Sequence, residues 1–365
     1  MLRYRRDELS IEMRLLSLIA TLGLAGCGSS RLPAFAPLAT GDAVQFVAFG
    51  DAGTGSAAQR AVGEAMAQLC ATRGCGFALE LGDNFYTSGV ESVDDAQWQS
   101  KFEIPFQNLK VPVFAALGNH DNSSDPGEGS NNRRGEVQVK YHYLAGRTSN
   151  KWNMPARYYN FTVPADTAAP LVEFFALDSN PFAANVPDAS PRYALQSYGR
   201  AHQDWFIEKL RSSRAHWKVA FAHHPYISNG GHGNAGTADG QPQGSTTTTS
   251  AKPWKDFIEA TGCQYGLDLF LFGHDHELEW LKPTANCPRL QHVMSGAAAR
   301  PRAFGDAHRN PAYWQEDSKL GFWWFRIRGD TLTGAAYVLD EEMKLPLDGA
   351  GVPVSAFEQS LTRAP

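Results

Sequence analysis

Five apolar runs in this chain stop at residues of the types that bind metal ions. Four of them end in a glycine that precedes the polar residue: Asp51, Asp83, Asn119 and His274. The fifth run ends directly on His223. His276 follows His274 by two positions, and on a strand this spacing points both side chains the same way. Carboxylate, amide and imidazole groups gathered at five strand ends predict a metal site.

The candidate ligands suit two ions better than one. Seven side chains are too many for a single ion: Asp51, Asp83, Tyr86, Asn119, His223, His274 and His276. A carboxylate shared by two cations holds them about 3.5–4 Å apart, the spacing of two-metal phosphate ester hydrolysis. Such ions turn a bound water into a hydroxide nucleophile and neutralise phosphoryl oxygens. The pattern therefore predicts phosphoester hydrolysis by a metal-bound hydroxide.

The elements that carry these residues alternate between strand and helix at first. Strands are expected at 45–50, 77–81 and 111–117, with helices at 56–70 and 94–104 between them. This order favours a largely parallel sheet with ligands at its carboxyl edge. Later strands are expected at 157–163, 171–177, 217–222, 267–272, 290–294, 320–328 and 331–339, with helices at 198–213 and 252–260. Together these elements suit two packed mixed sheets with helices outside.

Composition narrows the class of protein. With 365 residues, 43% of them apolar, the chain can bury a substantial core. A net charge of −5 provides no overall positive electrostatic potential, which argues against nucleic acid as a partner. The stretch Ser228–Ser250, rich in Gly, Asn and Thr, predicts a long mobile loop that overhangs the site.

The first residues predict an export signal rather than part of the fold. Leu15–Gly26 is apolar but too short to span a membrane core of about 30 Å. It ends in Leu24-Ala25-Gly26-Cys27, which resembles the lipobox of bacterial lipoproteins. We expect a signal peptide over 1–26, with Met13 as an alternative start, and a tether over 27–44. A lipid on Cys27 would place the protein on the periplasmic side of a bacterial membrane; an ordinary secretory signal is the alternative.

Four further cysteines fit an oxidising compartment. An even number in an exported protein suggests disulfides, here Cys70, Cys75, Cys263 and Cys287. If strands 267–272 and 290–294 are neighbours, a Cys263–Cys287 bridge falls at the edge remote from the metals. Cys70 and Cys75 would close a tighter loop.

The ligand motifs, taken in order, resemble those of the calcineurin-like metallophosphoesterases. They are Gly50-Asp51-x-Gly53, Gly82-Asp83-Asn84-Phe85-Tyr86, Gly118-Asn119-His120-Asp121, His223-x-Pro225 and Gly273-His274-x-His276. Tyr86, three residues after Asp83, narrows the resemblance to purple acid phosphatases of the small, tartrate-resistant type. It covers 45–340, leaving 341–365 as a C-terminal tail, and implies a four-layer α/β/β/α sandwich.

The resemblance also implies roles for individual residues. A ferric ion would bind Asp51, Asp83, Tyr86 and His276. A divalent iron, zinc or manganese ion would bind Asp83, Asn119, His223 and His274. The Tyr86 phenolate would give the family its purple colour. His120 would contact the phosphate, and His232 would assist the leaving group. The alternatives are a core or rim tyrosine for Tyr86 and a solvated loop histidine for His232.

Other readings remain open at this stage. The expected activity is that of an acid phosphatase on small phosphate monoesters, in a monomer held at the membrane only by its lipid. The same metal site would serve a phosphodiesterase, and a non-catalytic binding protein is a further alternative. Asp51 opposes a dinucleotide-binding reading of Gly50–Gly55, because phosphate needs bare backbone N–H groups there. The histidines outside any motif are expected at the surface or in the core: His142, His202, His216, His292 and His308.

Overall fold

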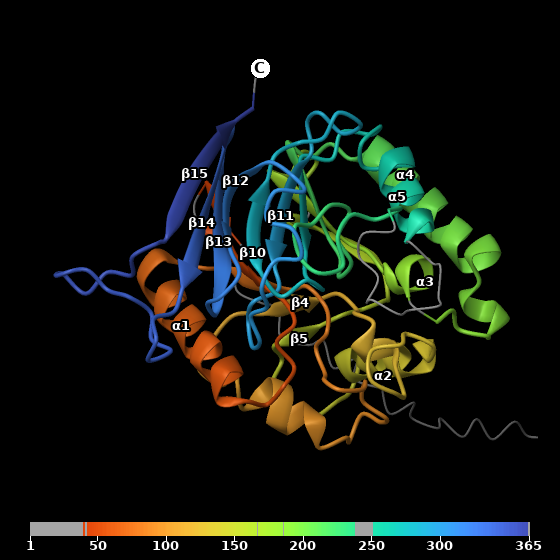
Figure 1. Cartoon of the computed structure of the whole chain (residues 1–365), viewed down its shortest axis with the longest axis horizontal. Helices are drawn as coiled ribbons and strands as arrows, with labels where there is room; N and C mark the ends of the chain where they lie inside the picture. The colour runs from red at the N-terminus through yellow and green to blue at the C-terminus, as the bar shows by residue number, and fades with distance from the viewer. Residues whose placement is uncertain (1–38, 41, 166, 185, 238–250, 364–365) are drawn as a thin grey trace, which may run out of the picture. The chain divides into compact units, whose positions relative to one another are not determined.

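Two β-sheets packed face to face carry the strand ends predicted to hold the ligands (Figure 1). The computed structural model describes residues 39–40, 42–165, 167–184, 186–237 and 251–363. The predicted signal peptide and most of the predicted tether lie outside these residues. Within the described part of the chain, no helix is long and apolar enough to cross a bilayer.

The first sheet has the order β15-β14-β13-β2-β3-β4-β5, and β1 pairs with β2. Strands β2 to β5 are parallel to one another, whereas β13, β14 and β15 are added antiparallel. The bounds are β1 (Ala39–Thr40), β2 (Ala43–Phe49), β3 (Phe77–Glu80), β4 (Val113–Ala115), β5 (Trp152–Asn153), β13 (Gly321–Arg328), β14 (Thr331–Val338) and β15 (Phe357–Thr362). β15 lies in the segment predicted as a C-terminal tail, so this sheet extends beyond residue 340.

The second sheet has the order β12-β10-β11-β9-β8-β7-β6. Strands β7, β8, β9 and β11 are parallel, and β6, β10 and β12 are antiparallel to their neighbours. The bounds are β6 (Tyr159–Val163), β7 (Val172–Ala176), β8 (Trp217–Phe221), β9 (Leu269–Phe272), β10 (Leu278–Leu281), β11 (Gln291–Ser295) and β12 (Ala312–Glu316). Every strand predicted from hydrophobic patterning is present, and β1, β5, β10, β12 and β15 are additional.

The helices agree less closely with the predictions. The longer ones are α1 (Ala57–Arg73), α2 (Asn132–His142), α4 (Arg200–Ser212) and α5 (Lys252–Ala260), and α3 (Asn180–Ala183) is a single turn. The Ser56 side chain caps α1 by accepting a hydrogen bond from the Gln59 N–H, as expected for an N-cap serine. The helix predicted at 94–104 shortens to the π-helical turn η1 (Trp98–Glu103). The polar helix α2 has no predicted counterpart.

Aromatic side chains fill the space between the sheets. Phe46 and Phe77, from the first sheet, both meet Phe174 of the second with ring centroids 5.2 Å apart. All three rings are fully buried. Such edge-to-face pairs add about 0.5–1.5 kcal/mol beyond the burial of apolar area. The two sheets are therefore held together by one continuous aromatic layer.

Helices cover the two outer faces, which completes the predicted four-layer sandwich. α1 contributes Val62, Met66 and Leu69 to the core of the first sheet. α4 and α5 pack Phe206 and Trp254, among others, against the second sheet. Figure 1 shows α1 on one side of the sheets and α4 with α5 on the other.

Both predicted disulfides are present. Cys70 pairs with Cys75, and Cys263 pairs with Cys287. Because β9 and β11 are parallel neighbours, the second bridge lies at their amino ends, away from His274. In the chain-entropy model a loop of this length adds about 3 kcal/mol of stability.

The beginning of the predicted loop 228–250 is well held. Ser228 and Asn229 are buried, and the Asn229 side-chain amide donates to the Asn310 carbonyl at 3.1 Å. The Glu279 carboxyl accepts from the Asn229 backbone N–H at 3.2 Å. The prediction of mobility is therefore wrong for these first residues, and residues 238–250 lie outside the described part of the chain.

Candidate metal centre

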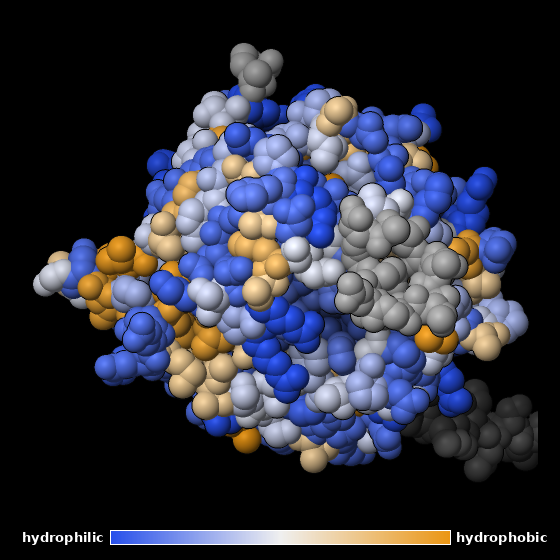
Figure 2. Space-filling view, in the orientation of Figure 1, coloured by the Kyte–Doolittle hydropathy of each residue, from blue (hydrophilic) through white to orange (hydrophobic). Residues whose placement is uncertain are grey.

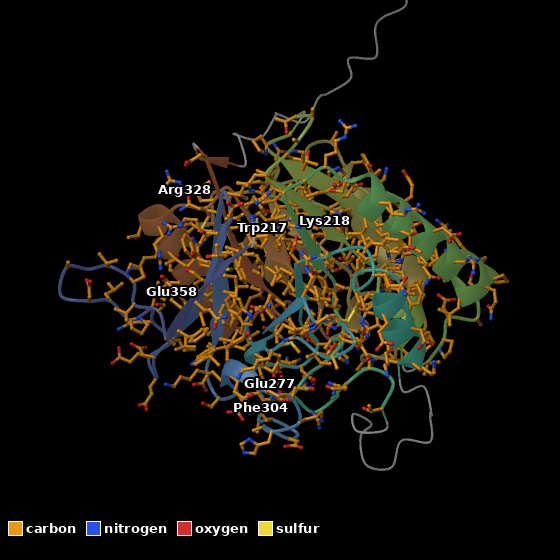
Figure 3. All side chains as sticks on the ribbon, turned by 90° about the horizontal axis from the view of Figure 1, so that it is seen from above. Trp217, Lys218, Glu277, Phe304, Arg328 and Glu358 are labelled. Carbon is orange, nitrogen blue, oxygen red and sulfur yellow. A yellow bond between two sulfur atoms is a disulfide. The ribbon has the colours of Figure 1, made fainter. Side chains whose placement is uncertain are left out.

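All six ligand-bearing positions predicted at strand ends meet at one edge of the sandwich. Asp51 follows β2, Asp83 follows β3 and Asn119 lies just beyond β4. From the second sheet, His223 follows β8, and His274 and His276 follow β9. The carboxyl ends of these parallel strands point the same way. In Figure 3, Glu277, next to the last ligand, lies at the end of the sheets opposite Trp217, where β8 begins.

Glycines allow the ligands to approach one another closely. A Cβ atom added to Gly118 would lie 2.1 Å from Oδ1 of Asp83. A Cβ atom added to Gly273 would lie 2.4 Å from Oδ2 of Asp51. The glycine before one ligand thus leaves room for the carboxylate of another, which explains why the strands stop at glycine.

Three ligand residues have a left-handed backbone. The φ angles are +58° at Asp51, +54° at Asp83 and +75° at His274. This conformation is unfavourable for residues other than glycine and concentrates at functional sites. It turns each side chain sharply back over the end of its strand.

One half of the cluster contains Asp51, Tyr86 and His276. The family resemblance assigns these three residues, together with Asp83, to a ferric ion. The Tyr86 hydroxyl donates to Oδ1 of Asp51 at 2.9 Å and lies 3.2 Å from Nε2 of His276. Nε2 of His276 is itself 3.5 Å from Oδ1 of Asp51. Tyr86 is therefore a member of the cluster, not a rim tyrosine.

The other half joins Asp83 to one amide and two imidazoles. Nε2 of His223 lies 3.4 Å from Oδ1 of Asp83 and 2.9 Å from Oδ1 of Asn119. Nδ1 of His274 lies 3.1 Å from Nε2 of His223. Ligand atoms of Asp51, Asp83 and His223 all fall within 4.8 Å of one another. Since Asp83 lies near both halves, its carboxylate is positioned to be shared.

Backbone carbonyls fix the orientation of two imidazoles. Nδ1 of His223 donates to the Leu81 carbonyl at 2.9 Å, and Nδ1 of His276 donates to the Arg300 carbonyl at 2.7 Å. In each ring Nε2 is left facing the oxygens of the cluster. An outer hydrogen bond of this kind orients metal-binding histidines and raises their basicity.

The electrostatics of the cluster favour a bound cation. Burial raises the pKa of Asp51 to about 8, against the opposing effect of His223. Burial, with help from Asp51 and Asp83, raises the pKa of the Tyr86 phenol well above its usual value. Despite burial, Asp83 and Asp51 raise the pKa of His223 to about 9. The protonated His223 ring therefore supplies positive charge to the cluster. A metal ion bound to this ring would displace the proton and supply the positive charge instead.

The donors fit two ions in number and type. Oxygen donors come from Asp51, Asp83, Tyr86 and Asn119, and nitrogen donors from three histidines. Carboxylate and carbonyl oxygens suit hard cations such as manganese, and imidazole suits iron and zinc. The glycine clearances and the outward-facing Nδ1 atoms show a site built around these donor atoms.

His120 lies beside the cluster without joining it. Its ring donates from Nδ1 to the Thr87 carbonyl at 2.6 Å, which leaves Nε2 3.9 Å from Oδ2 of Asp83. The ring is partly exposed and packs 4.3 Å from the Tyr86 ring, measured between centroids. This placement agrees with a group that contacts a substrate.

Asp121 supports the ligand loops rather than the His120 ring. Its carboxylate accepts the backbone N–H groups of Asn84, Phe85 and Gly118 at 2.8–3.2 Å. It thereby joins the loop that carries Asp83 to the one that carries Asn119. Asp121 thus positions two ligand-bearing loops through their backbones.

His232 is held by the aspartate that separates the two last histidine ligands. Nδ1 of His232 lies 2.6 Å from Oδ1 of Asp275, which also accepts the His232 backbone N–H. The Ser228 hydroxyl donates to the other oxygen of Asp275 at 2.5 Å. The His232 ring is part-exposed and its centroid lies 4.0 Å from that of His274. It is an oriented imidazole at the edge of the site, not a loose loop residue.

The remaining histidines lie away from the cluster. His202 and His292 are fully buried in the core, whereas His216 and His308 are exposed, and His142 is half-buried. The placement at surface or core is as predicted.

Sequence reasoning gave no role to His224, which packs its ring 4.4 Å from that of His274. The Ser179 hydroxyl accepts the His224 backbone N–H at 3.1 Å and lies 2.8 Å from Nδ1 of the same ring. Its position beside His223 in the His-x-Pro motif was the available signal. His224 is a buried neighbour of the ligands and supports His274 through ring packing.

Known proteins resemble the chain in both sequence and fold. The family described as calcineurin-like phosphoesterase matches residues 45–278. Tartrate-resistant acid phosphatase type 5 of Homo sapiens is 27% identical over 324 residues, covering 83% of this chain and 89% of the human protein. Purple acid phosphatase 3 of Arabidopsis thaliana is 27% identical over 283 residues, covering 74% and 68%.

Two solved structures share the fold. The Plasmodium protein GAP50, described as the anchor in the inner membrane complex, has a TM-score of 0.63 at 16% identity over 89% of this chain and 90% of its own. The purple acid phosphatase PPD1 from yellow lupin seeds has a TM-score of 0.57 at 14% identity over 90% and 55%. At these identities the likeness concerns the fold alone.

Proposed function

The chain belongs to the calcineurin-like phosphoesterase family, and from this premise we propose that it is an acid phosphatase that hydrolyses phosphate monoesters with two metal ions. The observation that carries the proposal is the shared position of Asp83 between two sets of donors. Asp51, Tyr86 and His276 lie on one side, and Asn119, His223 and His274 lie on the other. Identity to acid phosphatases of about 27% supports the monoester assignment.

The proposed metals are a ferric ion near Tyr86 and a divalent iron, zinc or manganese ion near Asn119. When bound, the two ions lower the pKa of water and neutralise phosphoryl charge. His120 would contact the phosphoryl group through Nε2, because Nδ1 is occupied by the Thr87 carbonyl. His232, oriented by Asp275, would deliver a proton to the leaving group. Because a protonated imidazole is needed for that step, we expect an acidic optimum.

The test of the dinuclear site is Asp83→Asn. Loss of a shared carboxylate should lower turnover of p-nitrophenyl phosphate by more than about 100-fold, the upper range for loss of an outer-shell partner. Metal content should fall below two ions per chain. Asp268→Asn is the matched control, because Asp268 is a largely buried aspartate at the amino end of β9, away from the cluster. Near wild-type turnover with both metals bound in Asp83→Asn would end the proposal.

The metal assignment has its own test in Tyr86→Phe. The ring would still pack against His120, whereas the phenolate that gives colour with ferric iron would be gone. We expect the visible absorption band to disappear and the fold to remain. A colourless wild-type protein that holds two zinc ions would assign it to the wider family instead.

A phosphodiesterase is the second candidate function, because the metal centre itself does not distinguish monoesters from diesters. Bis-p-nitrophenyl phosphate assayed beside the monoester separates the two. We expect the monoester to be preferred by at least about tenfold in kcat/KM, roughly the 1.4 kcal/mol difference in binding of one transition state over another.

We also propose that the protein is exported and held at a bacterial membrane by a lipid on Cys27, acting on small phosphate esters in the periplasm as a monomer. The motif Leu24-Ala25-Gly26-Cys27 supports the anchor. Metabolic labelling with palmitate should mark the wild-type protein but not Cys27→Ser. Equal labelling of both would exclude a lipid at this position.

A further inference from the structure

Three cationic side chains gather around Tyr86, on the side of the cluster assigned to the ferric ion. The Arg300 guanidinium lies over the Tyr86 ring, with Cζ 5.5 Å from the centroid. The Lys101 ammonium donates to the Tyr86 backbone carbonyl and, at 2.6 Å, to Gln97. The backbone N–H of Arg302 donates to the carbonyl of His276, so Arg302 begins beside that predicted ligand. All three cations therefore border the metal centre.

None of these cations is neutralised by an ion pair in the described part of the chain. No carboxylate there lies within 4 Å of the charged nitrogens of Arg300, Arg302 or Lys101. By contrast, Arg73, Arg134 and Arg328 have carboxylate partners at 2.7–3.1 Å. Burial lowers the pKa of Lys101 and the Asp95 carboxylate opposes that shift, so the unpaired positive charge is chiefly that of Arg300 and Arg302. Unpaired positive charge beside a catalytic centre favours anionic ligands and speeds their approach.

The backbone at Arg300 is fixed by the metal centre itself. The Arg300 carbonyl accepts a hydrogen bond from Nδ1–H of His276 at 2.7 Å. The backbone N–H of Arg302 donates to the His276 carbonyl at 3.2 Å. Hydrogen bonds to the predicted ligand His276 therefore fix the backbone at both Arg300 and Arg302. Both side chains are exposed, so they face the solvent from which a substrate arrives. Figure 2 shows strongly hydrophilic residues gathered near the centre of the visible face.

We propose that Arg300, with Arg302 and Lys101, forms a subsite for a second anionic group on the substrate. The inference rests on the proposed function and names its substrate class: small phosphate monoesters that also carry a carboxylate or another phosphate. A guanidinium presents a planar fork of donors that matches carboxylate and phosphate oxygens. While the metal centre takes the scissile phosphoryl group, Arg300 binds the second anion beside Tyr86 and His120.

The test compares two substrates that differ in one charge. Glycerate 3-phosphate carries a carboxylate where glycerol 3-phosphate carries a hydroxymethyl group, and phosphate release measures both. We expect the wild-type enzyme to favour glycerate 3-phosphate by at least about tenfold in kcat/KM, from one charge-assisted hydrogen bond pair. Most of that preference should appear in KM.

The variants assign the preference to residues. Arg300→Gln should reduce the ratio of kcat/KM between the two substrates by about tenfold, and Arg302→Gln by less. Arg300→Lys should keep part of the ratio, because it retains the charge without the fork. Arg326→Gln is the matched control and should keep the wild-type ratio. Arg326 is exposed on β13 and pairs with Gln45 near the start of β2, away from the carboxyl end that Asp51 follows.

Each result decides a different claim. Equal wild-type use of both substrates would overturn the subsite and leave the phosphatase assignment standing. A uniform loss in Arg300→Gln, with the ratio unchanged, would also overturn it, because Arg300 would then act only by packing on Tyr86. Hydrolysis of neither substrate nor of p-nitrophenyl phosphate by the metal-loaded wild type would contradict the proposed function itself, and the subsite with it.

Discussion

Two pairs of histidines are buried in this protein to the same extent and surrounded quite differently. His223 and His276 each donate from Nδ1 to a backbone carbonyl and point Nε2 at carboxylate or phenol oxygens. His202 and His292 are just as buried, and neither of their ring nitrogens has a hydrogen-bond partner. His202 stacks on Tyr158 at 4.2 Å within an aromatic cluster.

The difference shows that burial alone does not mark a metal ligand. Both pairs are shielded from water. Burial lowers the pKa of His202 and of His292 to about 3. In the ligand pair, a carbonyl fixes one nitrogen and anions face the other. In the core pair, apolar and aromatic neighbours keep the ring neutral. The partners of the two ring nitrogens thus distinguish a ligand from a packing residue.

The largest difference between the two pairs should appear when one member of each is replaced. His223→Ala removes a nitrogen donor and should lower turnover of p-nitrophenyl phosphate by more than about 100-fold. His292→Leu fills a similar volume without a polar atom and should keep turnover within about threefold of wild type, since core swaps of similar volume are tolerated. Metal content and steady-state rates measure both. Comparable losses of turnover in the two variants would show that the two pairs of histidines do not differ in function.

A smaller effect concerns stability in acid. A histidine whose folded pKa is about 3 binds its proton mainly in the unfolded chain between pH 6.5 and 3, so folding stability falls as pH decreases through that window. At pH 4, which is 2.5 units below the unfolded pKa of 6.5, each ring should cost about 3 kcal/mol, from roughly 1.36 kcal/mol per pH unit.

The variants His202→Leu and His292→Leu should flatten this acid limb, as measured by urea unfolding at pH 4 and pH 7. His216→Leu is the control, because His216 is exposed and its Nε2 lies 2.7 Å from an Asp330 carboxylate oxygen. An acid limb as steep in the double variant as in the wild type would refute the account of the core pair.

The smallest expected change extends the comparison to a carboxyl. Glu80 is fully buried at the end of β3, and both of its oxygens lack a hydrogen-bond partner. Burial, and then Asp121, raises its pKa well above the usual value. A raised acid pKa adds stability below the unfolded value of about 4.5, and that stability is lost as pH rises.

Glu80→Gln should therefore raise the free energy of unfolding at pH 8 relative to pH 5, compared with the wild-type protein. The gain is modest because a buried amide without partners is also unfavourable. Denaturant unfolding at the two pH values measures it. An unchanged difference between pH 5 and pH 8 would show that Glu80 ionises alike in folded and unfolded chains.

Much of the fold follows from patterns that are local in the sequence. Strands such as β2 and β9 are short apolar runs that stop at glycine, and α5 has its predicted bounds. β10 escaped prediction because Glu279 interrupts its apolar run. That carboxyl is held in the core by the Asn229 backbone N–H, which donates to it from fifty residues away. The polar helix α2 was missed for a related reason, since its buried residues include Asn132 and Gln138.

The site shows the same division. The side chains that converge, such as Asp51 and Tyr86, were identified because each follows a strand in a spaced motif. The groups that orient them were not, because they are contacts between distant parts of the chain. The carbonyl of Arg300 at His276 and the backbone donors at Asp121 are of this kind. Spacing reveals donors, whereas only the folded chain reveals what holds them.

The left-handed backbone at Asp51, Asp83 and His274 has a consequence for the evolution of such a scaffold. A left-handed residue other than glycine costs roughly 1–2 kcal/mol. A change to glycine at any of the three positions would relieve that cost and delete a ligand in the same step. Random mutation can therefore remove the metal-binding side chains and leave a more stable fold without the activity. Selection for turnover, against the preference of the backbone, is what keeps these side chains in place.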